Sequence, residues 1–455
     1  RCRGTGLDDG PRHRLTARDS KHNAPHDPGG ATGRRVPLAL MTDINQTSST
    51  SDSQSRSRPN ASSDSQAAPF RFAVVGVGQI SQQAFIPGLR SLPDAEIAAV
   101  VTSSEAKVRA VAKREGAGAG PDDDPDAPGR ATADGVAVYD YDEFPQLLER
   151  GGIDGIYVAT PVFRHREFAE PALEAGIPVL LEKPMADSVE DCEAMIAASE
   201  RTGAALMIAY RMHQDAYMVE LADMVARGVI GETRTFTSTF THDIEEGNHR
   251  GHSGFWGGPV PDFGAYPLNL VRHLFRAEPT HVHATGVASR GRNFDFQDGV
   301  GVTLRFPGDR VAQYTLSYNA ADLDTFQLVG AKGTITSDSC YGFAPEPPRN
   351  WTLTTDRGSE RHETTSVDQF AGETRYFIDC VRDGVRPEPD GREGLADVRI
   401  FAAIEESLRL GREVILPPHQ FGPGLGRDQI RAIPPRPADE IPEDDELADQ
   451  TPQDR

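Results

Sequence analysis

The sequence predicts an α/β protein that contains a doubly wound parallel sheet followed by a second domain with a largely antiparallel sheet. Short apolar runs alternate with helical stretches through the first half of the chain, an order typical of parallel sheets covered by helices. Beyond residue 212 the runs become β-rich, and several alternate polar with apolar residues, which indicates a sheet with one buried face.

The first expected strand ends in glycines. In "RFAVVGVGQIS", residues 71–81, Gly76, Gly78 and Ser81 match the spacing G-x-G-x-x-small. Such glycines let the chain turn between a strand and a helix, and they let backbone N–H groups approach a pyrophosphate at the helix N-terminus. An ordinary strand–turn–helix has the same spacing, so the motif gains its weight from the alternating pattern around it.

Further strands are expected at 96–101, 153–161 and 177–184, with a helix at 143–151 between two of them. Ligands of doubly wound sheets bind beyond the carboxyl ends of the strands. The residues that we expect at such ends, and therefore around a cofactor crevice, are Gly76, Ser103, Thr160 and Lys183.

The end of the second strand favours NADP over NAD. An NAD site usually has an acid there to bind the ribose 2′-hydroxyl. This chain instead has Ser103 and Ser104, preceded by Thr102, with Lys107 one helical turn further on. Small hydroxyls and a cation suit a 2′-phosphate, although Lys107 could also lie on a solvated helix face.

The remaining elements follow from local patterns. Residues 116–136 are rich in Gly, Pro and Asp and read as a surface loop. "SVEDCEAMIAASERTG" reads as an amphipathic helix that Ser188 caps. A strand in "AALMIAYR" follows it, then the β-rich segments 233–240, 299–307 and 311–318, and a late helix at 394–411.

Composition bounds the domains and the partners. We expect a disordered segment at 1–68, a nucleotide-binding domain at 69–190, a substrate-binding and oligomerisation domain at 191–421, and a disordered acidic tail at 422–455. The net charge of −22 argues against nucleic-acid and anionic-membrane partners. With no long apolar run and no cysteine pair at metal-ligand spacing, we expect a cytoplasmic protein without a bound metal.

A polar constellation lies in "GFWGGPVPDFGAYPLNLVRHLF", residues 254–275. Asp262, Tyr266 and Asn269 recur at spacings of four and three, and on a helix they would share one face. An acid, a phenol and an amide make a poor core face and a good polar site. The alternative is a helix-start cap at Asp262 and a half-buried tyrosine.

Lys183 adds a reason to read this constellation as chemistry. A nearby ammonium stabilises the phenolate form of a tyrosine, which an unassisted phenol does not reach at neutral pH. A Lys–Tyr pair beside a nicotinamide can remove an alcohol proton as hydride leaves. Lysine suits this role because it is a compact point charge with rotatable donors, whereas arginine is a planar fork.

With these motifs the chain resembles the glucose–fructose oxidoreductase / inositol dehydrogenase family over residues 70–420. The matching stretches are "AVVGVGQIS", "VATPVFRH", "EKPMADSVEDCEAMI", "LMIAYRMH", "GVIGE" and "DFGAYPLN". Many members have His at the position of Tyr266; tyrosine there resembles the sugar-oxidising branch, which contains glucose–fructose oxidoreductase and the archaeal NADP-dependent D-xylose dehydrogenases. The resemblance implies a Rossmann domain, a C-terminal α/β domain with an open sheet, and sheet-mediated homodimers or homotetramers.

The resemblance also implies roles for single residues. Lys183, Tyr266 and Asp262 would be catalytic, with Tyr266 as the acid–base, and together with Tyr210 they would bind the sugar. The implied cofactor-binding residues are Gly76, Gly78, Gln79, Ile80, Ser103, Ser104, Lys107, Thr160, Pro161, His165, Glu182, Lys183 and Arg211.

The implied reaction is NADP-dependent oxidation of the anomeric carbon of an aldose, D-xylose or a similar sugar, to a lactone. Two alternatives stay open: a glucose–fructose oxidoreductase-like enzyme that retains its nucleotide, and a non-catalytic NAD(P)-binding regulator. The chain departs from the family pattern at Val162, at Trp256 and in the loop "HDIEEGNHRGHSGF", so the identity of the sugar is the least determined part. Pro171 falls within a family helix, where we expect a kink or a late start.

Overall fold

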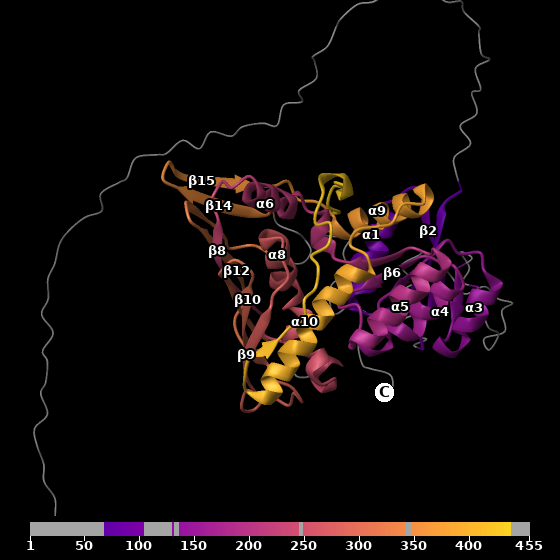
Figure 1. Ribbon diagram of the computed structural model, residues 1–455. Coiled ribbons are helices and arrows are strands. Elements are labelled where there is room, and N and C mark those ends of the chain that lie inside the picture. The colour runs from indigo at the N-terminus through magenta and orange to yellow at the C-terminus, as the bar shows by residue number, and fades with distance from the viewer. Residues whose placement is uncertain (1–67, 104–129, 132–135, 245–248, 343–347, 438–455) are drawn as a thin grey trace, which may run out of the picture. The chain divides into compact units, whose positions relative to one another are not determined.

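The computed structural model describes residues 68–103, 130–131, 136–244, 249–342 and 348–437. Its first half contains a seven-stranded sheet with the strand order β3-β4-β2-β1-β5-β6-β7. Figure 1 labels two of these strands, β2 and β6. Every pairing in it is parallel except that between β3 and β4. The strands are β1 (Phe70–Val75), β2 (Ala95–Val101), β3 (Arg130–Ala131), β4 (Ala137–Tyr139), β5 (Gly155–Val158), β6 (Val179–Glu182) and β7 (Leu206–Ala209).

The register of this sheet aligns the carboxyl ends of its strands. Val75 of β1 pairs with Val101 of β2 and with Val158 of β5. Val158 pairs with Leu181 of β6, which pairs with Ile208 of β7. The segments that follow five strands therefore emerge side by side along one edge, as the alternating pattern predicted.

Helices cover both faces of the first sheet, which is why its strands are apolar on both sides. One face packs against α3 (Phe144–Arg150), α4 (His165–Glu174) and α5 (Val189–Thr202). The other packs against a π-helical turn, η1 (Ser81–Phe85), that continues into α1 (Ile86–Arg90), and against α9 (Gln369–Asp383). The helix α9 thus returns from the C-terminal part of the chain to complete the core of the first sheet.

The second sheet has nine strands in the order β15-β14-β13-β12-β8-β11-β10-β9-β16. All pairings are antiparallel except that between β8 and β11. The predicted α/β class with a mainly antiparallel second sheet is therefore confirmed. The strands are β8 (Thr233–Thr241), β9 (His281–Val287), β10 (Gly299–Phe306), β11 (Arg310–Ser317), β12 (Leu323–Gly330), β13 (Gly333–Ser337), β14 (Asn350–Thr355), β15 (Gly358–Glu363) and β16 (Val414–Ile415).

One face of this sheet is buried and the other is open. The buried face packs against α6 (Ala216–Ala226), α8 (Ala265–Phe275) and one side of α10 (Gly391–Leu410). Phe236 and Leu316 lie on that face, whereas Thr237 and Thr315, their neighbours along the strands, line a hollow on the open face. This alternation is the period-two pattern that the sequence shows.

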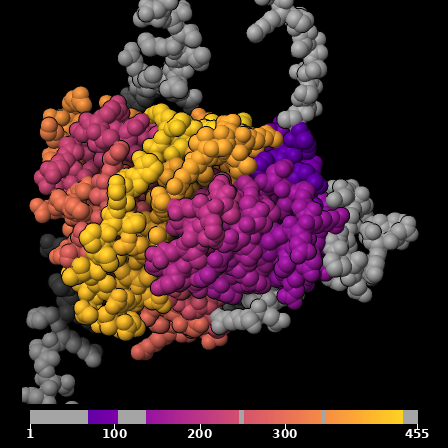
Figure 2. All heavy atoms as spheres, turned by 45° about the vertical axis from the view of Figure 1, so that its right-hand side comes forward, coloured from indigo at the N-terminus to yellow at the C-terminus, as the bar shows by residue number. Residues whose placement is uncertain are grey.

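The long helix α10 joins the two sheets. It packs against α5 and β7 of the first sheet and against β9 and β16 of the second. Figure 2 shows these C-terminal residues (yellow) against the magenta residues of the first domain. Asp390 caps its start by accepting hydrogen bonds from the amides of Arg392 and Glu393.

Three boundaries differ from expectation. The strand β7 pairs with β6, so the first sheet extends to residue 209, beyond the expected limit at 190. Residues 422–437, expected in the disordered tail, contact two helices: Arg427 pairs with Asp223 of α6, and the Arg436 guanidinium donates to the buried Asp368 carboxylate at the start of α9. Pro171 lies inside α4, which begins at His165 and so does not start late. By contrast, the predicted cap of α5 is confirmed, because the Ser188 hydroxyl accepts a hydrogen bond from the Asp191 amide.

Within the described ranges, the structure contains no helix that is both long and apolar enough to cross a membrane.

Candidate active site

The turn after β1 has the backbone that the glycine motif predicts. Gly76 has φ +88°, and a Cβ there would lie 2.7 Å from the carbonyl carbon of Ala159, so only glycine fits. At Gly78 a Cβ would meet nothing within 4 Å, which leaves open space beside the backbone. The third small residue, Ser81, is buried and donates its hydroxyl to the Gly76 carbonyl at 2.6 Å. Gln79 and Ile80 lie between these residues, at the start of the helix.

The turn after β5 offers a second position that fits a nucleotide. The Thr160 hydroxyl is buried and has no hydrogen-bond partner among the described residues, so a bound group could supply one. Pro161 follows it at the start of a short helical turn, η3 (Val162–Arg164). With open space at Gly78 and this orphaned hydroxyl along one edge of the sheet, the residues present fit a dinucleotide.

His165 joins the turn after β5 to the turn after β6. Its Nε2 lies 3.0 Å from the Thr160 carbonyl oxygen, and its Nδ1 lies 3.2 Å from that of Met185. The ring is fully buried, and burial lowers its pKa to about 4. The structure therefore supports a positioning role, and direct contact with the cofactor stays a prediction.

After β2, where we expect the cofactor to be selected, the structure describes Thr102 and Ser103. Thr102 is buried, and its amide donates to the Tyr139 carbonyl oxygen at 3.0 Å. Ser103 follows it and is exposed, so its hydroxyl could reach a ribose substituent. Ser104 and Lys107 lie outside the described residues, so their part in the NADP prediction is unchanged.

Lys183, which follows β6, meets Asp262 from the second domain. The Lys183 Nζ lies 3.1 Å from both the Asp262 Oδ1 and the Asp262 carbonyl oxygen. Each of the two side chains is 15% exposed, so the pair is largely shielded from water but still reachable. The other Asp262 oxygen, Oδ2, accepts a hydrogen bond of 2.8 Å from the hydroxyl of Tyr318, just beyond β11. The sequence did not lead us to Tyr318, although the alternation of apolar and polar residues along β11 places Tyr318 on the buried face.

The expectation that Asp262, Tyr266 and Asn269 share one helical face is wrong. The chain forms two short helices, α7 (Pro259–Asp262) and α8, separated at Phe263 and Gly264. Asp262 ends the first helix instead of capping the second. Asn269 faces away from the lysine, because its side chain contacts His213 and Glu393.

Two cations lie near the ring of Tyr266. The Lys183 Nζ is 5.0 Å from the centre of its ring, and so is the guanidinium carbon of Arg211. The Arg211 Nε donates to the Tyr266 hydroxyl at 3.3 Å. The Tyr266 hydroxyl therefore lies beside a buried guanidinium that donates a hydrogen bond to it.

Arg211 is fixed by contacts that the sequence analysis did not predict. Its guanidinium donates to the side-chain oxygen of Gln369 and to the carbonyl oxygen of Tyr341. Gln369 in turn donates to Asp215 at 3.0 Å. These contacts tie the segment after β7 to α9 and to residue 341 of the second domain, and they hold Arg211 beside Tyr266.

Two buried carboxyl groups lie behind the lysine. Glu182 accepts hydrogen bonds from the Tyr157 hydroxyl at 2.7 Å and from the Lys183 amide at 3.2 Å. Glu373 of α9 is fully buried, and both its carboxylate oxygens lack a partner among the described residues. Burial raises the pKa of both groups, and the charge of Glu182 raises that of Glu373 further. Tyr210, predicted to bind the sugar, is buried and donates its hydroxyl to Asp397 at 2.7 Å.

Comparisons with known proteins agree with this geometry. Residues 70–210 match the model described as "Oxidoreductase family, NAD-binding Rossmann fold", and residues 218–336 match the GFO/IDH/MocA C-terminal domain. The chain is 29% identical over 349 residues to a D-xylose 1-dehydrogenase [NADP(+)] of Haloarcula marismortui, covering 74% of this chain and 91% of that protein. It is 27% identical over 346 residues to a dTDP-3,4-didehydro-2,6-dideoxy-α-D-glucose 3-reductase of Actinomadura kijaniata, covering 75% and 96%.

Solved structures show the same fold. The aldose–aldose oxidoreductase of Caulobacter crescentus, complexed with glycerol, superimposes with a TM-score of 0.66 at 27% identity, covering 76% of this chain and all of that one. A 3-ketoreductase of Actinomadura kijaniata in complex with NADP gives 0.63 at 24% identity, covering 75% and 98%. With both domain models matched over more than half of its length, the chain belongs to the GFO/IDH/MocA family and is an NAD(P)-dependent oxidoreductase.

Proposed function

We propose that the protein is an NADP-dependent sugar dehydrogenase that oxidises the anomeric carbon of an aldose, D-xylose or a similar sugar, to a lactone. The observation that carries the proposal is the meeting of Lys183, Asp262 and Tyr266 beyond the end of β6. An acid, an ammonium and a phenol at one partly shielded point can bind a polyhydroxylated substrate and move one proton. The similarity to D-xylose 1-dehydrogenases supports the choice of an aldose.

NADP⁺, when bound along the sheet edge, would supply the hydride acceptor for C1 of the sugar. Tyr266 accepts the proton of the C1 hydroxyl, while Lys183 and Arg211 stabilise the negative charge that passes through the phenolic oxygen. Asp262 orients Lys183 and accepts a hydrogen bond from a sugar hydroxyl. Tyr318 keeps the Asp262 carboxylate in place through its bond to Oδ2.

Two features support NADP as the cofactor. Ser103 is exposed where an NAD enzyme has an acid. The xylose dehydrogenase relatives are named for NADP⁺. We propose that Gly78, Thr160 and Lys183 hold the nucleotide along the sheet edge, with Ser103, Ser104 and Lys107 around the 2′-phosphate.

The test is a steady-state assay of Lys183→Ala and Tyr266→Phe with D-xylose and other aldoses. Each change should lower kcat by about 10²–10⁴-fold, the usual contribution of a positioned acid–base group. Lys332→Ala is the matched control, because Lys332 is exposed on the turn between β12 and β13 and should leave kcat unchanged. Near-normal turnover in both site variants would refute the assignment.

A second candidate function is favoured by one comparison. The similarity to an aldose–aldose oxidoreductase suggests an enzyme that keeps its nucleotide and passes the hydride to a second sugar. Purified protein with stoichiometric nucleotide that is not released during turnover would favour this reaction. A regulator without catalysis is disfavoured because Lys183 and Tyr266 are both present; a panel of aldoses and polyols that all fail to reduce NADP⁺ would favour it.

The open face of the second sheet is the surface that we propose for a homodimer or homotetramer. It is rich in threonine and lies opposite the helices that bury the other face. Sedimentation velocity would measure the oligomeric state, and Thr237→Arg in the middle of β8 should weaken an assembly through this face.

A further inference from the structure

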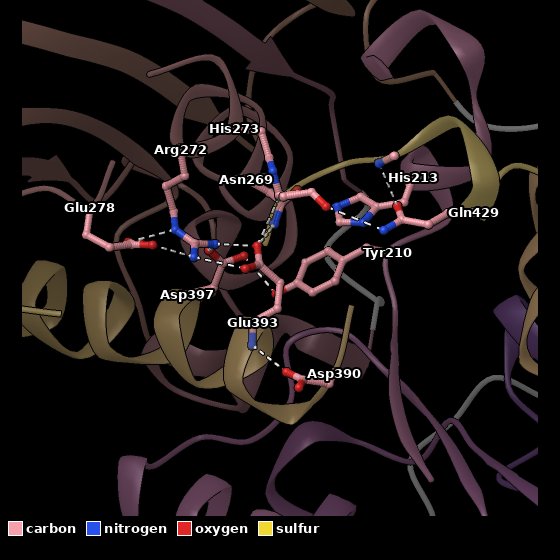
Figure 3. Close-up of polar contacts among 12 residues, drawn as sticks. Tyr210, His213, Asn269, Arg272, His273, Glu278, Asp390, Glu393, Asp397 and Gln429 are labelled. Carbon is pink, nitrogen blue, oxygen red and sulfur yellow. Dashed lines mark hydrogen bonds and ion pairs between the residues drawn. The ribbon is translucent and has the colours of Figure 1, made fainter. Parts of the chain in front are cut away.

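A second polar cluster lies beside the proposed active site, and the proposed reaction assigns it no role. Its centre is Arg272 of α8, whose side chain is fully buried. Three carboxylates surround it, those of Glu278, Glu393 and Asp397, and each is at most 6% exposed (Figure 3). We call these four residues the Arg272 network.

The geometry uses every donor of the guanidinium. Its five N–H groups make five hydrogen bonds, of 2.9 and 2.8 Å to Glu278, 2.7 and 3.2 Å to Glu393, and 2.6 Å to Asp397. A lysine has only three donors on one nitrogen and could not reproduce this fork. The network is therefore specific for arginine in shape as well as in charge.

The network is connected to the proposed active site through two short paths. Asp397 accepts a hydrogen bond from Tyr210, whose neighbour in the chain, Arg211, donates to Tyr266. Arg272 lies on α8, the same helix as Tyr266, less than two turns away. Both partners of the Arg211–Tyr266 contact are thus attached to elements that the network fixes.

The charges in the network do not balance if all three acids are ionised. One guanidinium faces three buried carboxylates, and a buried net charge is costly. The other titratable groups around Asp397 are the hydroxyls of Tyr210 and Tyr314, which are uncharged, and His273, which contacts Glu393 at 3.2 Å. A retained proton on one acid is the simplest way to reduce the excess.

Glu393 and Asp397, which both accept a hydrogen bond from the Arg272 Nη1, differ in which of them keeps a proton. Burial raises the pKa of Asp397 to about 7, with Arg272 opposing and Glu393 adding to the rise. Burial would also raise the pKa of Glu393, but Arg272 and His273 hold it well below its usual range. When Asp397 is protonated it can donate to the Tyr210 oxygen, so the contact survives with its direction reversed.

We propose that Arg272 and Asp397 are positioning residues, which hold Arg211 against Tyr266 only while the network retains one proton on Asp397. The inference rests on the proposed function, because it assigns the network to the geometry of that proton transfer. When the proton leaves, the added buried charge loosens the Tyr210 segment and α8. Turnover then falls because the contact between Arg211 and Tyr266 is weakened.

The first test is the pH profile of kcat for wild type and Asp397→Asn with saturating aldose. The amide is neutral at every pH and has nearly the shape of the protonated acid. Wild type should lose turnover as the pH rises above neutral, whereas Asp397→Asn should keep kcat within about twofold of its low-pH value over the same range. The same descending limb in both proteins would overturn the proposal.

The second test separates shape from charge. Asp397→Ala removes the acceptor, and Arg272→Lys keeps the charge but loses the fork. Both should lower kcat at least tenfold, while the Kd for NADPH, measured by fluorescence titration, should stay within about twofold. Wild-type turnover in both variants with only a lower Tm would show that the network stabilises the fold and nothing more.

Two measurements decide the network without any turnover. In Asp397→Ala, backbone hydrogen exchange should become faster in residues 208–214 and 265–273 but not in β1 or β2. If Asp397→Ala does not fold, the same comparison is made with Arg272→Lys. The stability of wild type relative to Asp397→Asn should fall as the pH rises from about 4 to about 7, because the raised pKa lets the folded state bind the proton more tightly than the unfolded state does. If no aldose is oxidised, the proposed function fails. Unchanged hydrogen exchange in the variants would independently refute the positioning role of the Arg272 network.

Discussion

The two glycines of the turn after β1 lead to opposite predictions. Substitution of Gly76 should destabilise the fold, whereas substitution of Gly78 should weaken cofactor binding. In Gly76→Ala the new methyl group would lie 2.7 Å from the Ala159 carbonyl atoms, and the backbone would remain at φ +88°. A left-handed conformation costs a non-glycine residue roughly 1–2 kcal/mol, and overpacking against backbone costs roughly 1–3 kcal/mol. We therefore expect a loss of about 2–5 kcal/mol in the free energy of unfolding.

Gly78→Ala is the matched control and should behave in the opposite way. Its methyl group meets nothing within 4 Å, so the free energy of unfolding should change by no more than about 0.5 kcal/mol. The same methyl would occupy the space through which a pyrophosphate approaches the backbone. We expect the Kd for NADPH to rise at least tenfold, which corresponds to about 1.4 kcal/mol.

Urea unfolding measures the first quantity, and fluorescence titration with NADPH measures the second. Gly76→Ala with wild-type stability would show that the turn relaxes easily and that the contact with Ala159 is not a constraint. Gly78→Ala with a wild-type Kd would show that the nucleotide does not pass this turn. That result would contradict the cofactor position on which the proposed reaction depends.

Three further predictions concern single side chains. Ser103→Asp should repel a 2′-phosphate and bind a ribose hydroxyl, and so reverse the preference in kcat/KM from NADP⁺ to NAD⁺. A wild type that prefers NAD⁺ would contradict the prediction that the end of β2 selects NADP. Tyr318→Phe removes a donor to the Asp262 carboxylate, a bond worth roughly 1.5–3 kcal/mol, so kcat/KM should fall about ten- to a hundredfold, and an unchanged value would exclude a role for that bond. The pKa of His165 is lowered to about 4, so the folded state resists protonation and wild type should lose stability as the pH falls from about 6.5 to about 4. In urea unfolding, His165→Gln should lack this part of the pH dependence. An equal dependence of stability on pH in both proteins would contradict the prediction.

The sheet edge that holds the site could be predicted because its signals are local. Each strand is a short apolar run, and the residue after it is visible in the sequence: Gly76 after β1, Thr160 near the end of β5 and Lys183 after β6. Parallel strands place these ends along one edge whatever the packing of the other domain. The capping serine of α5 is local in the same sense, and it was predicted for the same reason.

The break between α7 and α8 shows where spacing alone misleads. Asp262 and Tyr266 have helical spacing, but a Cβ at Gly264 would lie 2.3 Å from the Val260 carbonyl oxygen, so the chain packs there in a way that only glycine permits. Proline at 261 and 267 also marks the segment as irregular. A closer interpretation of these breakers would have separated Asp262 from the helix of Tyr266 before the structure was known.

The contacts that decide protonation could not be predicted, because each joins residues far apart in the chain. Asp262, Asp215 and Asp397 are the same residue type, yet their surroundings differ completely. Asp262 receives an ammonium and a phenol, so its charge is matched at the point where a sugar would bind. Asp397 shares one guanidinium with two other acids and meets Tyr210 from 187 residues away, so its surroundings favour a proton. The different roles that we propose for these two aspartates therefore follow from the folded arrangement. Asp397→Asn should change the pH profile of kcat. Asp262→Asn should instead lower kcat/KM.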